Sequence, residues 1–316
     1  MPSLPNDAPP WRSTAAAAAG AQQYPAPALY VVATPIGNLA DISLRALHVL
    51  ALADVVACED SRVTGSLLRH FGIDKPLLRL HEHNERTAAA AVLEHLRGGA
   101  RVAYASDAGT PAISDPGAAL VEAIVAAGHR VVPVPGASSV TAALSVAGAT
   151  AGEGFRVCGF APSKGQARQR AWDDAAADPG TQVWLEAPHR IAVLADEWAA
   201  RMPARRITVC REITKQFESI ATMTAADMPA WLAADAQRQR GEFVLVLHAL
   251  APVDPAAAAG DGARAAEAEL QRVLDLLLAE LPLKQAVALA ARIARAPRNA
   301  VYALALRRRA DPSDKG

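Results

Sequence analysis

The sequence predicts an α/β protein with two α/β domains, a parallel-sheet domain and then a mixed-sheet domain, followed by a small helical C-terminal segment. Apolar strand-like runs alternate with helix-like runs up to about Thr150, which is typical of a parallel sheet covered on both faces. Beyond that point the strand-like runs follow one another with fewer helices between them, which favours antiparallel pairing. The length of 316 residues agrees with about two domains.

Composition divides the chain into five segments. Residues 1–28 are rich in Ala and Pro and are expected to be a disordered tail. Residues 29–149 form the expected N-terminal α/β domain and residues 150–250 the second α/β domain. A Pro/Ala/Gly linker covers 251–262 and a helical segment covers 263–316.

In the N-terminal domain, apolar runs predict the strands and capping residues bound the helices. Asp41 is expected near the N-cap of the first helix, and Gly72 ends the second. Asp115 as N-cap and Pro116 at the first helical position begin a helix that Gly128 ends. In chain order the elements are a strand at 29–33, helix 41–53, strand 55–60, helix 61–72, a strand beginning at 77, helix 86–99, strand 100–106, helix 115–128, a strand and loop at 130–139, and helix 139–148.

The second domain is expected to contain more strands than helices. Strand-like runs cover residues 155–163, 181–188, 205–213, 217–224 and 241–250, and helices cover 165–176, 189–202 and 225–236.

Three further helices are expected over residues 263–280, 283–295 and 297–309, the last ending in three arginines. Two short amphipathic helices around a turn resemble a helix-turn-helix, which can lie against nucleic acid. A plain helical hairpin that closes the second domain is the alternative.

The net charge of zero argues against a strongly basic nucleic-acid binder, although local basic patches stay open. Three widely spaced cysteines indicate neither a disulfide framework nor a zinc site, so a reducing, cytoplasmic location is expected. No apolar run is long and charge-free enough to predict a membrane span, and no metal site is expected.

Five loops rich in Gly, Pro and short polar residues follow predicted strands. In open α/β sheets ligands bind beyond the carboxyl ends of the strands, so these loops are expected to share one pocket. The alternative is that Gly and Pro only make turns. The glycine signature of dinucleotide-binding folds and the P-loop are both absent. The loops are TPIGN, CEDSR, HEHNE, SDAGTPAISDPG and PGASS.

Eight motifs occur in an order that resembles the ribosomal RNA small subunit methyltransferase I family of the tetrapyrrole methylase superfamily. They are TPIGNLADIS, CEDSR, HEHNE, SDAGTPAISDPG, VPVPGASS, EAPHR, REITKQFE and GEFVLVL. The resemblance runs from about Leu29 to the C-terminus. It implies two domains of tetrapyrrole methylase type with S-adenosylmethionine held in the cleft between them. It also implies 2′-O-methylation of a cytidine in 16S rRNA of the small ribosomal subunit, and a homodimer.

Loops of Gly and Ala let backbone groups approach such a methyl donor closely. Asp107 could hold its amino group or a ribose hydroxyl, or could instead stabilise its own loop through an Asx-turn. The resemblance carries the other cofactor-binding positions, which are Pro35, Gly37, Asn38, Ala108, Gly109, Thr110 and Ser138.

Methyl transfer to a sugar hydroxyl is an in-line displacement that positioning accelerates, and the hydroxyl must also lose a proton to a base. Each acidic or imidazole side chain in the loops could instead be a solvated or capping residue. The candidates for base or positioning residue are Glu59, Asp60, His83 and Glu186, with His189 beside the last.

Several cations could neutralise RNA phosphates, although each could also be an ordinary surface charge. Two rival functions stay open: C-methylation of a tetrapyrrole precursor, and a ribosome-assembly factor that binds RNA without catalysis. The candidate RNA-binding residues are Arg62, Lys164, Arg190, Arg211 and Lys215.

Overall fold

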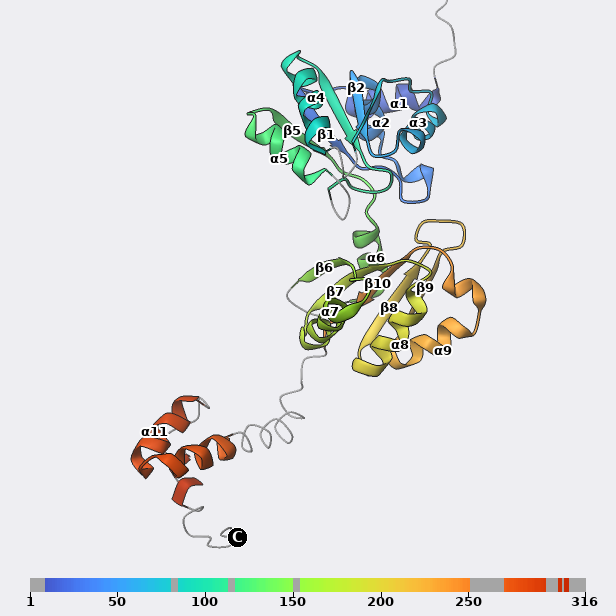
Figure 1. The fold of residues 1–316 in the computed structure, drawn as a ribbon. Helices are drawn as coiled ribbons and strands as arrows, with labels where there is room; N and C mark the ends of the chain where they lie inside the picture. Colours follow the sequence, from blue (N-terminus) through green and yellow to red (C-terminus); the bar gives the residue numbers. More distant parts are fainter. Residues whose placement is uncertain are drawn as a thin grey trace, which may run out of the picture. The chain divides into compact units, whose positions relative to one another are not determined.

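The computed structural model describes residues 9–80, 85–112, 117–149, 154–250, 270–293, 301–302 and 304–306. The chain divides into two compact units, an N-terminal unit of Met1–Leu250 and a C-terminal unit of Ala251–Gly316 (Figure 1). The N-terminal unit contains both predicted sheets, so the predicted α/β fold class is confirmed.

The first sheet is parallel throughout and has the strand order β3-β2-β4-β1-β5. Its inner strands are apolar because both faces of a parallel sheet are covered. The carboxyl ends of the strands therefore meet at one edge, where the predicted loops begin. The strands are β1 (Ala28–Val32), β2 (Val55–Cys58), β3 (Leu77–Arg79), β4 (Arg101–Ala105) and β5 (Arg130–Val134).

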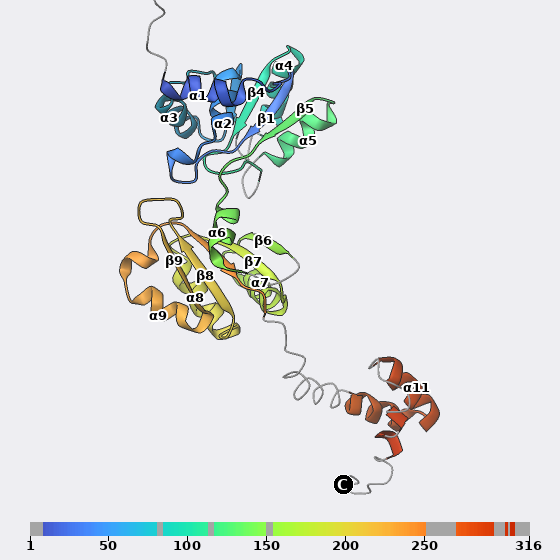
Figure 2. The ribbon, with the colours of Figure 1, turned by 180° about the vertical axis from the view of Figure 1, so that it is seen from behind.

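Alternate residues of these strands pack into two separate clusters, one on each face. Tyr30 belongs to the cluster with α2 (Leu44–Leu52) and α3 (Ser61–His70). Tyr104 belongs to the cluster with α4 (Glu85–Arg97) and α5 (Ala118–Ala126). Both ribbon views show α4 and α5 on the face opposite α2 and α3 (Figures 1 and 2).

The second sheet is mixed and has the order β6-β7-β10-β8-β9, in which only β6 and β7 are parallel. Helices α7, α8 and α9 contribute to one buried cluster with this sheet, built around Trp172, Trp184 and Trp198. The strands are β6 (Phe155–Phe160), β7 (Thr181–Glu186), β8 (Arg206–Arg211), β9 (Ser219–Thr224) and β10 (Phe243–Leu247); the helices are α7 (Gly165–Ala177), α8 (Ile191–Arg201) and α9 (Met228–Ala233), and short 3-10 turns cover Ala225–Asp227 and Ala236–Gln239.

Helix α6 (Ser139–Ala147) packs on the second sheet, although the predicted boundary assigns it to the N-terminal domain. Its apolar side, with Val140 and Ala143, joins Val183 and Val244 in a cluster separate from the tryptophans. The apolar spacing in the sequence predicts this helix, but it does not indicate which sheet the helix packs against.

The expected disordered tail is wrong over Pro10–Ala19, which forms helix α1. The Trp11 indole N–H donates to the Phe71 carbonyl at 3.0 Å, and the two rings meet edge to face. Ala15 and Ala19 are buried, and α1 contacts α2. Small alanine side chains let this helix approach α2 closely, so the low-complexity run is a packing surface. Residues 1–8 lie outside the described residues.

Two of the predicted helix starts need correction. Ser43, rather than Asp41, is the N-cap of α2, and its hydroxyl accepts a hydrogen bond from the Ala46 N–H. Asp41 lies in the preceding short 3-10 turn Leu39–Asp41. Helix α5 begins after Gly117, and the expected cap residues Asp115 and Pro116 lie outside the described residues.

In the C-terminal unit, residues 270–280 and α11 (Leu283–Ile293) are helical. Leu274, Val287, Ala290, Val301 and Ala305 form a buried apolar cluster in this unit. The predicted linker 251–262 lies outside the described residues.

The buried His248 predicts a pH dependence of stability. Its Nε2 lies 2.8 Å from the Thr208 hydroxyl, and burial, with Arg206 and Arg205 nearby, lowers the pKa of His248. Below a pH of about 6.5 the unfolded chain therefore binds a proton that the folded chain resists. We expect the free energy of unfolding to be highest above that pH and to fall toward pH 5, by about 1.4 kcal/mol for each unit by which the pKa is lowered.

Urea unfolding at pH 7.5, 6.5 and 5.5 measures this effect, with the variant His248→Gln as the comparison. The variant should be less sensitive to acid over this range than the natural chain. Equal losses of stability in both proteins would rule out His248 as the source.

Candidate functional site

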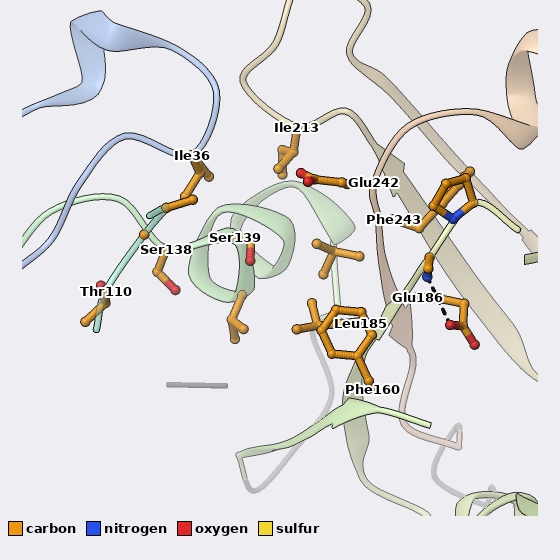
Figure 3. Close-up of a pocket in the computed structure, with 16 residues that line it drawn as sticks. Ile36, Thr110, Ser138, Ser139, Phe160, Leu185, Glu186, Ile213, Glu242 and Phe243 are labelled. Carbon is orange, nitrogen blue, oxygen red and sulfur yellow. Dashed lines mark hydrogen bonds between the residues drawn. The ribbon is translucent and has the colours of Figure 1, made fainter. Parts of the chain in front are cut away.

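A cavity of about 380 Å³, the first cavity, opens between loops of the first sheet and strand ends of the second. Side chains from loops and strands of both sheets surround it, with hydroxyls on one side and apolar groups and two carboxylates, Glu186 and Glu242, on the other (Figure 3). Its volume falls within the range of small-molecule sites. The lining residues from the first sheet and α6 are Ile36, Ala108, Gly109, Thr110, Ser138, Ser139 and Val140. Those from the second sheet and its loops are Phe160, Leu185, Glu186, Ala187, Pro188, Ile213, Glu242, Phe243 and Val244.

The turn at Gly109 is fixed by backbone pairing with the first loop, the TPIGN segment that follows β1. Thr34 and Gly109 exchange two hydrogen bonds, at 2.9 and 3.1 Å. The Ser106 hydroxyl donates to the Gly109 carbonyl, and the Thr34 hydroxyl donates to the Ser106 carbonyl. Gly109 has a φ of +81°, and a Cβ there would lie 3.2 Å from the Ile36 side chain. A glycine is therefore required where the backbone lines the cavity.

The first turn of α6 contributes backbone N–H groups and hydroxyls to the first cavity. Ser138 is the N-cap of this helix and makes no side-chain capping bond. The first N–H groups of a helix lack partners within the helix, so they can donate to a polar ligand. The Thr110 hydroxyl donates to the Ala137 carbonyl at 3.1 Å, which connects the loop after β4 to this turn.

Glu186 is fully buried and held in place by cations. Its Oε1 accepts from the Ala187 N–H at 2.9 Å and lies 3.0 Å from Arg190 Nε. Its Oε2 has no hydrogen bond among the described residues, and Arg168 Nη1 is 3.8 Å away. Arg168 also pairs with Glu197 at 2.7 Å. Among the candidate bases that the structure describes, only Glu186 lines this cavity; its Oε1 is committed to the Ala187 N–H and Arg190, whereas its Oε2 makes no hydrogen bond among the described residues.

A second cavity of about 570 Å³ lies on the other side of the same two loops. Pro35 and Gly37 line it, whereas Ile36 lines the first cavity. Asp107 lines it, whereas Ala108 faces the first cavity. The expected cofactor residues are therefore divided between two cavities rather than gathered in one.

The remaining predicted residues of the loops have local structural contacts. The Asn38 side chain accepts from the Ala40 N–H, and Asp107 accepts from the Asp60 N–H at 3.0 Å. Asp60 caps α3, and hydrogen bonds from Arg62 lower the pKa of Asp60 to about 2. Glu59 follows β2 and lines neither cavity. His83 lies outside the described residues.

Four of the five candidate RNA-binding cations are engaged within the protein, and one of them is Arg62, which bonds to Asp60. Arg190 donates to the Ala161 carbonyl at 2.6 Å, and Arg211 donates to the Phe217 carbonyl at 2.9 Å. Lys215 bonds to both Glu212 and Glu242. Although burial opposes the shift, these two carboxylates raise the pKa of Lys215. Lys164 is exposed at the N-cap of α7, and Arg62 is exposed at the second cavity.

Of the residues that the second sheet contributes to the first cavity, only Glu186 is among the predicted site residues. Ile213, Glu242, Phe243 and Val244 lie inside the motifs REITKQFE and GEFVLVL, which supplied the signal without indicating a cavity. Phe160 ends β6 with its side chain largely exposed, and nothing in its local pattern distinguishes it from a strand residue.

Over the described residues, no helix is long and apolar enough to cross a membrane. Within the same part of the chain, His, Cys, Asp and Glu side chains form no group of three that could hold a metal ion.

The sequence of the chain is similar to that of known methyltransferases. Residues 28–229 match the family described as Tetrapyrrole (Corrin/Porphyrin) Methylases, and residues 264–309 match the RsmI C-terminal HTH domain. The chain is 47% identical over 282 residues to ribosomal RNA small subunit methyltransferase I of Pseudomonas aeruginosa, covering 89% of this chain and 97% of that protein. It is 43% identical to the protein of the same name from Escherichia coli O157:H7, covering 88% and 94%.

Solved structures share the fold at lower identity. The crystal structure of cobalt precorrin-4 methyltransferase, a cobalamin biosynthetic enzyme, aligns with a TM-score of 0.53 at 22% identity, covering 71% of this chain and 96% of that one. The methyltransferase CobJ aligns with a TM-score of 0.53 at 19% identity, covering 70% and 93%. Both alignments support two linked α/β sheets of this type.

Proposed function

Because this chain belongs to the ribosomal RNA small subunit methyltransferase I family, within the tetrapyrrole methylases, we propose that it methylates the 2′-hydroxyl of a cytidine ribose in 16S rRNA. S-adenosylmethionine is the proposed methyl donor. The observation that carries the proposal is the first cavity, where the loop Ala108–Thr110 and the first turn of α6 face the second sheet.

The chemistry of the lining suits such a donor. Hydroxyls and backbone groups at Thr110, Ser138 and Ser139 can bond to a ribose and an amino-acid head, and Leu185 and Phe243 offer apolar contact to a base. None of the sixteen lining residues is Lys, Arg or His, whereas Glu186 and Glu242 are acidic. A cationic sulfonium therefore meets no like charge from these side chains.

The donor, when bound, supplies an electrophilic methyl group. The chain's own contribution is to hold the acceptor hydroxyl in line and exclude water, which can account for most of the acceleration. Asp60 is a weak base because of its low pKa; in Glu186, Oε1 is committed to Arg190 and the Ala187 N–H, and Oε2 lies 3.8 Å from Arg168 Nη1. We therefore assign positioning, rather than proton transfer, to these two carboxylates.

The two rival functions have less support. The relatives at 40–47% identity carry the ribosomal RNA methyltransferase name, and residues 264–309 match a domain described for that family. Likeness to tetrapyrrole methylases of 19–22% identity supports only the fold. An intact cavity between the sheets argues against a factor without catalysis.

The test is transfer of tritium from labelled S-adenosylmethionine to small ribosomal subunits from a strain that lacks the family's enzyme. Digestion of the rRNA to nucleosides should place the label in 2′-O-methylcytidine. Label in another nucleoside would overturn the substrate assignment. Transfer to a porphyrinogen instead would favour the tetrapyrrole rival, and no affinity for the donor by calorimetry would favour the non-catalytic one.

We further propose that the chain acts in the cytoplasm as a homodimer, as the family resemblance implies. Sedimentation equilibrium of the full chain should then give about twice the monomer mass of 32.9 kDa.

A further inference from the structure

The second cavity differs in charge from the first. It is formed largely by helix α3 and the first loop, with Arg62, Ser66 and His70 supplied by α3. The sequence of α3, SRVTGSLLRH, contains no Asp or Glu. Arg69 and His70 add basic groups to its last turn. Asp107 is the one acidic side chain among the residues that line the second cavity, whereas Glu186 and Glu242 line the first cavity with no basic side chain beside them. Of the two cavities, only the second therefore offers a cation to a ligand.

Arg62 is held in position at the edge of the second cavity. Its Nε and Nη2 donate to the Asp60 carboxylate, at distances down to 2.6 Å, and its side chain is 85% exposed. Among the described residues, Nη1 donates to no acceptor. The paired Asp60 thus fixes the guanidinium plane while leaving donors toward solvent, a geometry that suits a phosphate.

Apolar side chains at the same cavity are unusually exposed. Leu39 and Val63 are 43% and 44% exposed, although both line the cavity wall. An apolar surface beside a fixed guanidinium is complementary to one nucleotide, whose base is apolar on its faces and whose phosphate is anionic. The volume of about 570 Å³ lies in the range of sites that hold ligands of this size.

The two cavities share their dividing wall. Residues 35–37 alternate between the two cavities, and in the other loop Asp107 lines the second cavity while residues 108–110 line the first. A ligand in each cavity would therefore contact the same two loops. Gly37 in the first of these loops packs against the Lys215 side chain, which a Cβ there would overlap.

Resting on the function proposed above, we propose that the second cavity binds a nucleotide of the RNA strand next to the target cytidine. Its phosphate contacts Arg62, and its base or ribose lies on Leu39 and Val63. The cavity thereby fixes the strand across the loops from the donor. Arg62 acts in binding and takes no part in proton transfer.

The test measures binding of unmethylated small ribosomal subunits to the full chain at several salt concentrations. Arg62→Gln should weaken this binding about tenfold at low salt, and the slope of log K against log salt should fall by about 0.7, as for one lost single-strand phosphate contact. Ser66→Tyr, on an exposed position of α3, should obstruct the cavity and weaken binding further. Affinity for S-adenosylmethionine, measured by calorimetry, should stay within twofold in both variants.

Arg170→Gln is the matched control, because Arg170 is exposed on α7 and lines neither cavity. It should leave affinity and salt slope unchanged, and thermal unfolding of all three variants checks that they are folded. The inference is overturned if Arg62→Gln and Ser66→Tyr bind subunits like the natural chain, or if they lose donor affinity equally. A changed molecular mass in Ser66→Tyr would instead assign the cavity to a second copy of the chain.

Failure of the proposed function gives a different result. In that case the natural chain transfers no methyl group to subunits, whatever the two variants do. The binding measurement needs no methyl transfer, so the two ideas succeed or fail separately.

Discussion

Replacing Arg168 with methionine should lower the free energy of unfolding of the N-terminal unit by about 3–5 kcal/mol. The Arg168 side chain is only 5% exposed and lies between two carboxylates, with Glu197 at 2.7 Å and Glu186 at 3.8 Å. It also donates to the Pro162 carbonyl and covers the Trp172 ring at 4.8 Å. Methionine fills much of the volume of the Arg168 side chain but carries no charge, so the buried Glu186 carboxylate keeps only Arg190 as a nearby cation among the described residues.

Urea denaturation followed by tryptophan fluorescence measures this loss, because Trp172, Trp184 and Trp198 lie in the affected cluster. Arg201→Met is the control on the neighbouring helix α8. Arg201 pairs with Asp173, whose side chain is 69% exposed, so its replacement should cost less than about 1 kcal/mol. Similar losses in the two variants would show that burial of the Arg168 network contributes little.

The double variant Arg168→Met with Glu197→Gln should recover part of the loss, because it removes the charge of Glu197, the carboxylate that loses its cation in Arg168→Met. If the loss of unfolding free energy in the double variant equals the sum of the losses in the two single variants, the Arg168–Glu197 ion pair does not account for the destabilisation.

Replacing Gly109 with valine should reduce kcat/KM for methyl transfer at least a hundredfold, with loss of donor affinity. At a φ of +81°, a β-branched side chain is strained, and its Cβ would lie 3.2 Å from Ile36 on the cavity wall. The Thr34–Gly109 backbone pairing prevents the turn from moving away without breaking two hydrogen bonds. A hundredfold loss corresponds to about 2.7 kcal/mol of transition-state stabilisation.

Gly128→Val separates strain from site disruption. Gly128 has nearly the same φ, +78°, with nothing within 4 Å of a Cβ, and it follows α5 away from the first cavity. Both variants carry the backbone strain and should lose stability in thermal unfolding, Gly109→Val more because of its contact with Ile36, while only Gly109→Val should lose donor binding by calorimetry and methyl transfer to small subunits. Equal activity of the two variants would mean that the Gly109 turn does not border the donor.

The sequence predicts the first sheet well because its signals are local. Each buried strand is a short apolar run, and the loop after it is rich in Gly and Pro, so the edge that carries the site follows from parallel pairing. The family resemblance, rather than a local signal, directs attention to Ala108–Thr110, and the structure places these residues on the wall of the first cavity.

What the sequence does not reveal depends on contacts between distant segments. The burial of α1 depends on Trp11 meeting Phe71, sixty residues away. Glu186 looks like a candidate base until Arg168 and Arg190 are seen on either side of its carboxylate. Pro35 and Ile36 are adjacent in one motif, yet they face different cavities, and no residue-type pattern encodes that alternation.

Helix α6 leaves the first sheet, borders the first cavity with its opening turn and buries its flank against β10 of the second sheet. A ligand that binds to the first turn of α6 therefore contacts a helix that is itself packed into the core of the second sheet. Filling the cavity and fixing the mutual orientation of the two sheets are then thermodynamically linked, so each must favour the other to the same extent.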